Sequence, residues 1–146
     1  MAVLVIAEHD NNILKTSTLN TITAATKLSD DIHLLILGKD IQTLSNNAKT
    51  IHPIKKILKC DNSKLENFIP ELSAPIISHI ANGYSHILAP ASTFGKNLLP
   101  RVSALLDVTQ ISDVIEIKSE NTFVRPIYAG NAISHVETNQ NINLLT

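Results

Sequence analysis

The middle of the chain reads SHILAPASTFGKNLLPRVSALL, residues 85–106, and this stretch indicates the fold. It begins with a run typical of a buried strand, continues into a loop of small residues, and then carries apolar residues at helical spacing. That order is typical of an α/β protein, which presents backbone amides at the carboxyl edge of a parallel sheet. The helix is expected to begin near Lys96 or Asn97, because Pro100 in a helix interior would cost on the order of 3 kcal/mol.

Strand-length apolar runs recur at residues 3–7, 32–37, 56–60 and 86–89, and stretches with helical spacing lie between them. This alternation predicts βαβ units in a three-layer, Rossmann-like α/β fold, with a parallel sheet flanked by helices. Ser17 or Thr18 is expected to cap the first helix, and Ser73, which precedes Pro75, is expected to cap the third. A further prediction is that Arg101 either pairs with an acid such as Asp113 or projects toward a partner.

The pattern changes after Leu106. Residues 111–117, 122–128 and 132–137 read as strands, and no helix fits between them. We expect antiparallel strands attached to the edge of the parallel sheet, with Gly130 and Asn131 supplying positive φ at a turn. The final apolar run, residues 142–145, suggests one domain over residues 1–146 that is truncated inside a strand.

The composition of the chain limits the classes of function that it can have. With a net charge of -1 and 17% charged residues, the chain has no basic field for nucleic acid or anionic membrane. Cys60 is its only cysteine, so no internal disulfide can form. The apolar run after Met1 is too short to span a bilayer. These features favour a soluble protein of the cytoplasm, or a matured organellar one.

The familiar site motifs are missing. No two of the four glycines lie close enough for a dinucleotide fingerprint or a P-loop. Glu8-His-Asp10 follows the first strand, but neighbours along a chain point apart, and the other histidines show no metal-ligand spacing. No catalytic residue and no metal site is therefore predicted. Residues 91–96 either form an anion-binding helix terminus or only cap a helix, and Arg125 either bridges to an acid or belongs to an interface.

Several segments, in one order along the chain, resemble the amino-terminal domain of the electron transfer flavoprotein alpha subunit. They are residues 3–9, 18–26, 94–101 and 111–131. The resemblance implies an electron carrier and not an enzyme. Such a carrier is a heterodimer with a beta subunit, which accepts electrons from dehydrogenases, such as those of fatty acid β-oxidation that act on acyl-CoA. It passes them to a membrane quinone reductase and so toward the respiratory chain.

The resemblance also implies that FAD is bound by a carboxyl-terminal domain that this chain lacks. No residue here is assigned to FAD, and the amino-terminal domain is expected to be a scaffold and subunit interface. The residues predicted for that interface are Phe94, Lys96, Asn97, Arg101, Arg125, Tyr128 and Asn131. The competing prediction is a stand-alone nucleotide-binding α/β module of the adenine nucleotide alpha hydrolase-like fold, resembling universal stress proteins, with its ligand at residues 91–96.

Overall fold

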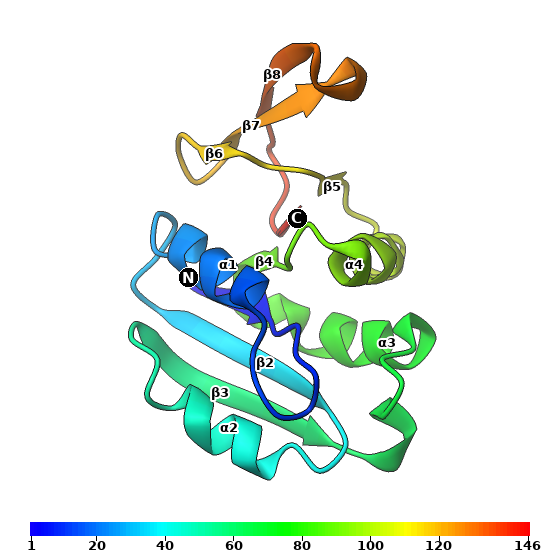
Figure 1. Ribbon diagram of the computed structural model, residues 1–146. Helices are drawn as coiled ribbons and strands as arrows, with labels where there is room; N and C mark the ends of the chain where they lie inside the picture. Colours follow the sequence, from blue (N-terminus) through cyan, green and yellow to red (C-terminus); the bar gives the residue numbers. More distant parts are fainter.

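The computed structural model describes residues 1–146 and contains two sheets (Figure 1). The larger has six parallel strands in the order β3-β2-β1-β4-β9-β5. Its strands are β1 (Ala2–Ile6), β2 (Ile32–Gly38), β3 (Ile54–Asp61), β4 (Tyr84–Leu88), β5 (Gln110–Ile111) and β9 (Asn143–Leu145). The predicted parallel sheet is confirmed.

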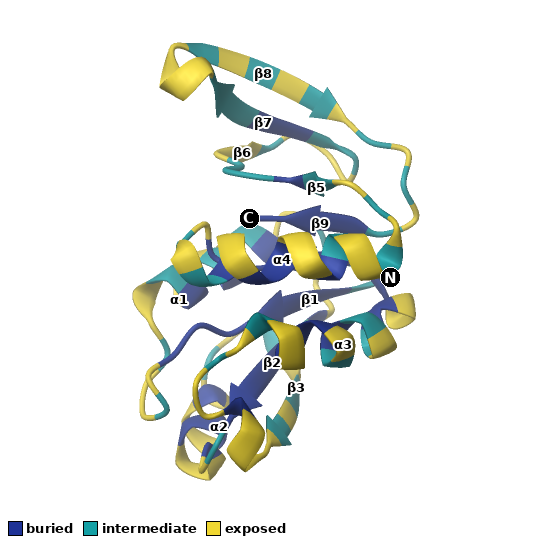
Figure 2. Cartoon of the chain, turned by 90° about the vertical axis from the view of Figure 1, so that its right-hand side faces the viewer, coloured by how far each residue is buried: buried dark blue, intermediate teal, exposed yellow.

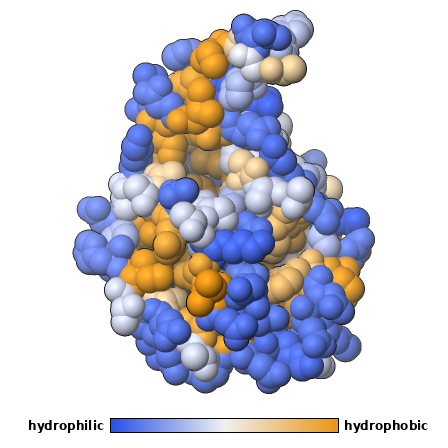
Figure 3. Space-filling view, in the orientation of Figure 1, coloured by the Kyte–Doolittle hydropathy of each residue, from blue (hydrophilic) through white to orange (hydrophobic).

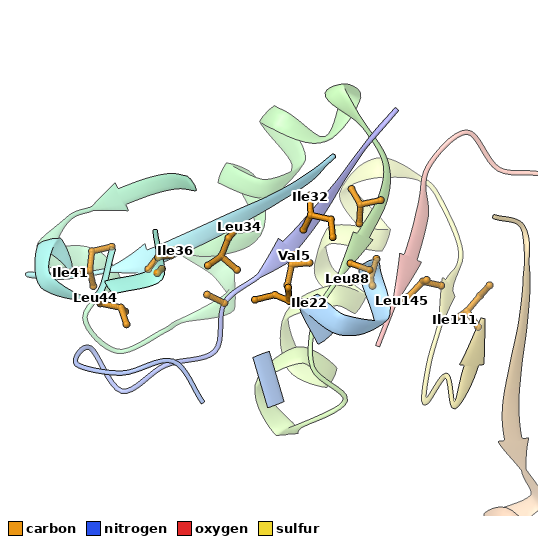
Figure 4. Packing of buried hydrophobic residues seen from close by; sticks show 14 of the residues in the cluster. Val5, Ile22, Ile32, Leu34, Ile36, Ile41, Leu44, Leu88, Ile111 and Leu145 are labelled. Atoms are coloured by element: carbon orange, nitrogen blue, oxygen red, sulfur yellow. The ribbon is translucent and has the colours of Figure 1, made fainter. Parts of the chain in front are cut away.

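Helices cover both faces of this sheet, which confirms the predicted three layers. They are α1 (Thr16–Ala25), α2 (Gln42–Ala48), α3 (Pro70–Ile80) and α4 (Thr93–Leu106). Alternate residues of β1 point to opposite faces, so Val3 and Val5 pack with Ile22 of α1, whereas Leu4 and Ile6 pack in the cluster that contains α3 and α4 (Figure 4 shows the first cluster). Burial on both faces explains why these strands read as continuous apolar runs.

The helices begin earlier than the sequence predicts. The Ser17 or Thr18 cap is wrong, because α1 begins at Thr16 and Lys15 is its N-cap residue. The Ser73 cap is wrong as well, because Pro70 is the first residue of α3.

In the same way α4 begins at Thr93, so Pro100 lies inside the helix. A proline leaves the carbonyl four residues earlier without a helical partner. That carbonyl belongs to Lys96, and both Lys96 and Pro100 are exposed, so water can reach this side of the helix (Figure 2).

The antiparallel strands form a sheet of their own, which we call the lobe: β6 (Glu116–Ile117), β7 (Thr122–Ile127) and β8 (Ala132–Glu137). Figure 1 shows it projecting from the body of the molecule. Two corrections follow. The lobe packs against the parallel sheet instead of extending its hydrogen-bonded edge, and residues 111–117 are not one strand, because Asp113 at φ 56° separates β5 from β6.

The turn between β7 and β8 differs in part from the expectation. Gly130 has the predicted positive φ of 89°, but Asn131 has φ -78°. Tyr128 and Ala129 adopt positive φ instead.

The last strand has an unexpected position. β9 lies inside the six-stranded sheet, between β4 and β5, and Leu145 pairs with both Leu88 and Ile111. Residues 143–145 therefore form an inner strand of the sheet, next to the edge strand β5.

Candidate functional site

The carboxyl edge of the parallel sheet is the natural place for a site. The chain runs from β1 outward to β2 and β3 on one side, and β4 begins the other half of the sheet. In open α/β sheets, ligands bind outside the carboxyl ends of the strands where the order reverses in this way. Here that point lies between the ends of β1 and β4, where Glu8 and Ser92 meet.

The Glu8 carboxylate is the centre of a polar network at this point. One oxygen accepts a hydrogen bond from the Lys15 ammonium at 2.9 Å, and the other accepts from the hydroxyls of Ser17 at 3.0 Å and Ser92 at 2.8 Å. The Glu8 backbone is held as well, because its N–H donates to Thr18 Oγ1 and its carbonyl accepts from the same hydroxyl. The network ties the end of β1 to the first turns of α1 and to the start of α4.

The network decides the charge state of Glu8. Burial acts to raise the pKa of this carboxyl, since Glu8 is only 7% exposed. The hydrogen bonds from Lys15, Ser92 and Ser17 outweigh burial and hold the pKa below its usual value. The switch point of the sheet therefore already holds an internal anion.

This anion bears on the two alternatives for residues 91–96. Ser92 does not cap α4 through its side chain but donates to Glu8. Lys96 forms an ion pair with Asp113 at 2.6 Å. Two of the side chains that would bind a phosphate, those of Ser92 and Lys96, are thus engaged in contacts within the chain.

Gly95 permits a close approach between α4 and the loop before it. A Cβ at this position would lie 2.0 Å from the carbonyl oxygen of Pro90. The glycine in the quoted stretch is therefore required for packing at the start of α4.

The residues that follow Glu8 are structural. His9 is 4% exposed, its Nε2 bonds the Leu37 carbonyl at 3.0 Å, and its Nδ1 accepts from the Asn11 amide. Burial lowers the pKa of His9, against the opposing effect of the bond to Leu37. Asp10 accepts from the amides of Asn12 and Ile13 in a local turn. The three side chains do not converge, and the structure brings together no three His, Cys, Asp or Glu residues that could hold a metal ion.

The predicted interface residues divide into groups. Lys96 and Arg125 lie close together, because their partners are consecutive residues. Lys96 pairs with Asp113, and Arg125 Nε donates to the Ser112 carbonyl at 2.8 Å. Arg101 does pair with an acid, as one of its two predicted alternatives has it, but Asp113 is the wrong partner. The ion pair is with Glu71 of α3, at 2.6 Å. Asp113 pairs with Lys96 instead.

The other interface residues lie further apart. Phe94 packs edge-to-face on Phe68, with ring centroids 6.2 Å apart, and Asn97 is exposed on α4. At the tip of the lobe, Tyr128 is 79% exposed, and Asn131 Nδ2 donates to the Tyr128 carbonyl. The seven residues do not form a compact cluster, because Lys96 faces Asp113 whereas Arg101 faces Glu71 of α3.

A second buried polar contact escaped the sequence analysis. His86 of β4 is 4% exposed, and its Nε2 lies 2.7 Å from the Glu120 carbonyl in the turn between β6 and β7. Burial lowers the pKa of His86, although the bond to Glu120 opposes this. Asn143 of β9 lies beside the same ring. No local pattern signals this contact, because its members are distant in sequence.

A groove of about 570 Å³ opens beside the Glu8 network. One wall is the face of α1 that carries Ser17, Asn20 and Ala24, and the opposite wall is residues 114–117. Residues 88–92 together with Leu145 and Thr146 line its floor.

No helix of the structure combines the length and the apolar character that crossing a membrane requires.

The fold and this edge define a class: a doubly wound α/β domain whose switch point carries its own Glu8 carboxylate, bonded to the starts of α1 and α4. Comparison with known families gives the particular one, since the electron transfer flavoprotein domain matches residues 3–146. The chain belongs to the electron transfer flavoprotein domain family.

Curated relatives support the same family assignment. The chain is 47% identical to the electron transfer flavoprotein subunit alpha of Pseudomonas aeruginosa over 146 residues, which is 100% of this chain and 47% of the relative. It is 46% identical over 143 residues to the mitochondrial subunit alpha of Dictyostelium discoideum, covering 92% of this chain and 40% of that protein. A probable mitochondrial subunit alpha of Caenorhabditis elegans is 41% identical, over 98% of this chain and 44% of that protein. The chain thus spans about half the length of these relatives.

Proposed function

We propose that this chain is the amino-terminal domain of the alpha subunit of a heterodimeric electron transfer flavoprotein. The observation that carries the proposal is the 47% identity to a subunit alpha over every residue of the chain. The heterodimer accepts electrons from dehydrogenases, such as those acting on acyl-CoA, and passes them through a quinone reductase toward the respiratory chain. It works in the bacterial cytoplasm or, as a matured protein, in the mitochondrial matrix.

In this proposal the domain is a scaffold and subunit interface, and FAD is bound by a carboxyl-terminal domain. The Glu8 network supports that division, because it engages Lys15, Ser17 and Ser92 at the switch point, where this fold class binds ligands. Bound FAD supplies the redox chemistry of the family. The residues of this chain position the domain that holds it.

The proposed interface with the beta subunit contains Phe94, Lys96, Asn97, Arg101, Arg125, Tyr128 and Asn131. Tyr128 is its best single test, because it is 79% exposed at the tip of the lobe and exposed tyrosines are frequent anchors of interfaces. Tyr128→Ala should weaken association with the beta subunit roughly 30-fold, which corresponds to about 2 kcal/mol. Lys55→Ala, on the exposed edge strand β3, is the control. Equal affinity of both variants and the unaltered protein would exclude the lobe tip from the interface.

The visible absorption spectrum of the full-length protein, co-produced with its beta subunit, tests the whole proposal. A flavin spectrum in the purified complex, with this 146-residue chain colourless on its own, is the expected result. A colourless full-length protein that does not associate with the beta subunit would contradict it. Binding of AMP or ATP by that protein would then favour the nucleotide-binding alternative.

A further inference from the structure

The groove beside α1 has an open apolar wall that no part of the chain covers. Ile115 lines this wall and is 62% exposed, and Val114 and Ile117 stand on either side of it. Figure 3 shows apolar surface along the lobe, the part of the molecule to which this wall leads. The facing side of α1 carries the short side chains of Ser17, Thr21 and Ala24, which allow a peptide backbone to approach closely.

The backbone at the floor of the groove is held in place. The N–H of Thr146 donates to the Ile111 carbonyl at 3.1 Å, and its carbonyl accepts from the Val114 amide at 2.8 Å. Thr146 Oγ1 accepts from the Asp113 amide at 3.2 Å. Residue 146 is 7% exposed and lies among the residues that line the groove.

The direction of β9 completes the argument. β9 is parallel to β4 and ends at the same carboxyl edge, so its continuation leaves the sheet at the groove. The relatives are about twice as long as this chain, which covers 47% and 40% of two of them.

We infer that, in the full-length protein, the polypeptide that follows Thr146 lies in this groove, between α1 and residues 114–117. Apolar side chains of that segment cover Ile115, and its backbone packs on the short side chains of α1. A segment bonded directly to the floor has an effective concentration in the millimolar range, which a second copy or a separate subunit must exceed. The inference rests on the part of the proposed function in which the chain continues into a second domain.

In this arrangement the first residues after Thr146 are part of the core of the amino-terminal domain. They are then not a free linker, and the orientation in which the chain leaves this domain is set by the groove. The groove would thereby help to position the flavin domain relative to the lobe.

Thiol labelling of the full-length subunit tests the inference. In a Cys60→Ser background, Asn20→Cys places a thiol in the groove, and Leu19→Cys places one on the neighbouring exposed surface of α1. In the subunit without its beta partner, a maleimide should modify position 20 at least about 10-fold more slowly than position 19. Lys27→Cys, further along the groove, repeats the measurement if Asn20→Cys lowers the thermal midpoint.

Two results would overturn the inference. Equal rates at positions 19 and 20 would mean that the groove is open in the full-length subunit. Protection that arises only after the beta subunit is added would assign the groove to the partner. Because the labelling needs neither flavin nor partner, its outcome is separate from that of the absorption experiment.

Discussion

The Glu8 carboxylate joins three segments of the chain through hydrogen bonds to Lys15, Ser17 and Ser92. Its position follows from β1, which ends at Ile6, two residues before Glu8, so that the side chain reaches Ser92 at the start of α4. At the scale of single residues, this contact and the approach of Gly95 to Pro90 organise the carboxyl edge.

Glu8→Ala should lower the free energy of unfolding by about 1–3 kcal/mol, because it leaves three donors without their acceptor. Urea denaturation at neutral pH measures the change. Glu66→Ala, which removes an exposed ion pair with Lys39, is the control and should change stability much less, because solvent screens an exposed pair. The Glu8 contribution should be complete above the usual carboxyl pKa and disappear as the pH falls through its lower folded value. Equal costs for the two variants would show that the network does not stabilise the fold.

Gly95→Ala should destabilise the protein by at least the roughly 1–3 kcal/mol typical of overpacking, because its Cβ would meet a backbone carbonyl at 2.0 Å. Gly83→Ala is a matched control, since a Cβ at Gly83 has no neighbour within 4 Å. Its effect should stay within about 0.5 kcal/mol. Thermal midpoints of the two variants test the difference, and an unchanged midpoint for Gly95→Ala would show that α4 can shift freely.

At the scale of elements, the lobe depends on its contact with the body. Phe123 of β7 is 0% exposed and belongs to the same apolar cluster as Ile111 and Leu145. The His86 ring of β4 also forms a hydrogen bond with the Glu120 carbonyl in the turn between β6 and β7. Lys96 of α4 forms an ion pair with Asp113, in the segment that leads into the lobe. Apolar packing and polar contacts together fix the lobe to the parallel sheet.

Phe123→Ala should cost about 3–5 kcal/mol, the usual price of emptying a core phenylalanine site. Ile133→Ala, on the 55% exposed side chain of β8, should change stability by no more than about 0.5 kcal/mol. Hydrogen exchange should show lost protection across β6, β7 and β8 together in Phe123→Ala. Loss confined to residues next to position 123 would contradict a lobe that folds as one unit with the core.

At the scale of the whole molecule, two buried histidines couple stability to pH. Burial lowers the folded-state pKa of His9 and of His86, so each stays neutral in the fold when it would be protonated in the unfolded chain. As the pH falls below about 6.5, the unfolded state binds protons first, and stability decreases. Above that pH the two histidines contribute no slope.

The free energy of unfolding should therefore fall as the pH drops below about 6.5, with a slope that flattens in His86→Gln. Urea titrations at several pH values measure the slope. A slope unchanged in His86→Gln would show that His86 titrates alike in the folded and unfolded states.

Periodicity alone determined much of this fold. Alternation of apolar runs predicted the parallel sheet and the helical layers, because both faces of each inner strand must be buried. Local conformation was less predictable, and α1, α3 and α4 all begin earlier than the sequence predicts. Ser17 bonds the Glu8 carboxylate instead of capping α1, Pro70 begins α3, and α4 keeps Pro100 in its interior.

Only the tertiary structure decided what lies at the carboxyl edge. Glu8 and Ser92 are separated by 84 positions, and no spacing rule relates them. The same holds for β9, whose three residues read as an unremarkable apolar run until pairing with β4 and β5 places them in the sheet. Sequence patterns record which residues are buried, whereas contacts between distant segments arise only when the chain is packed.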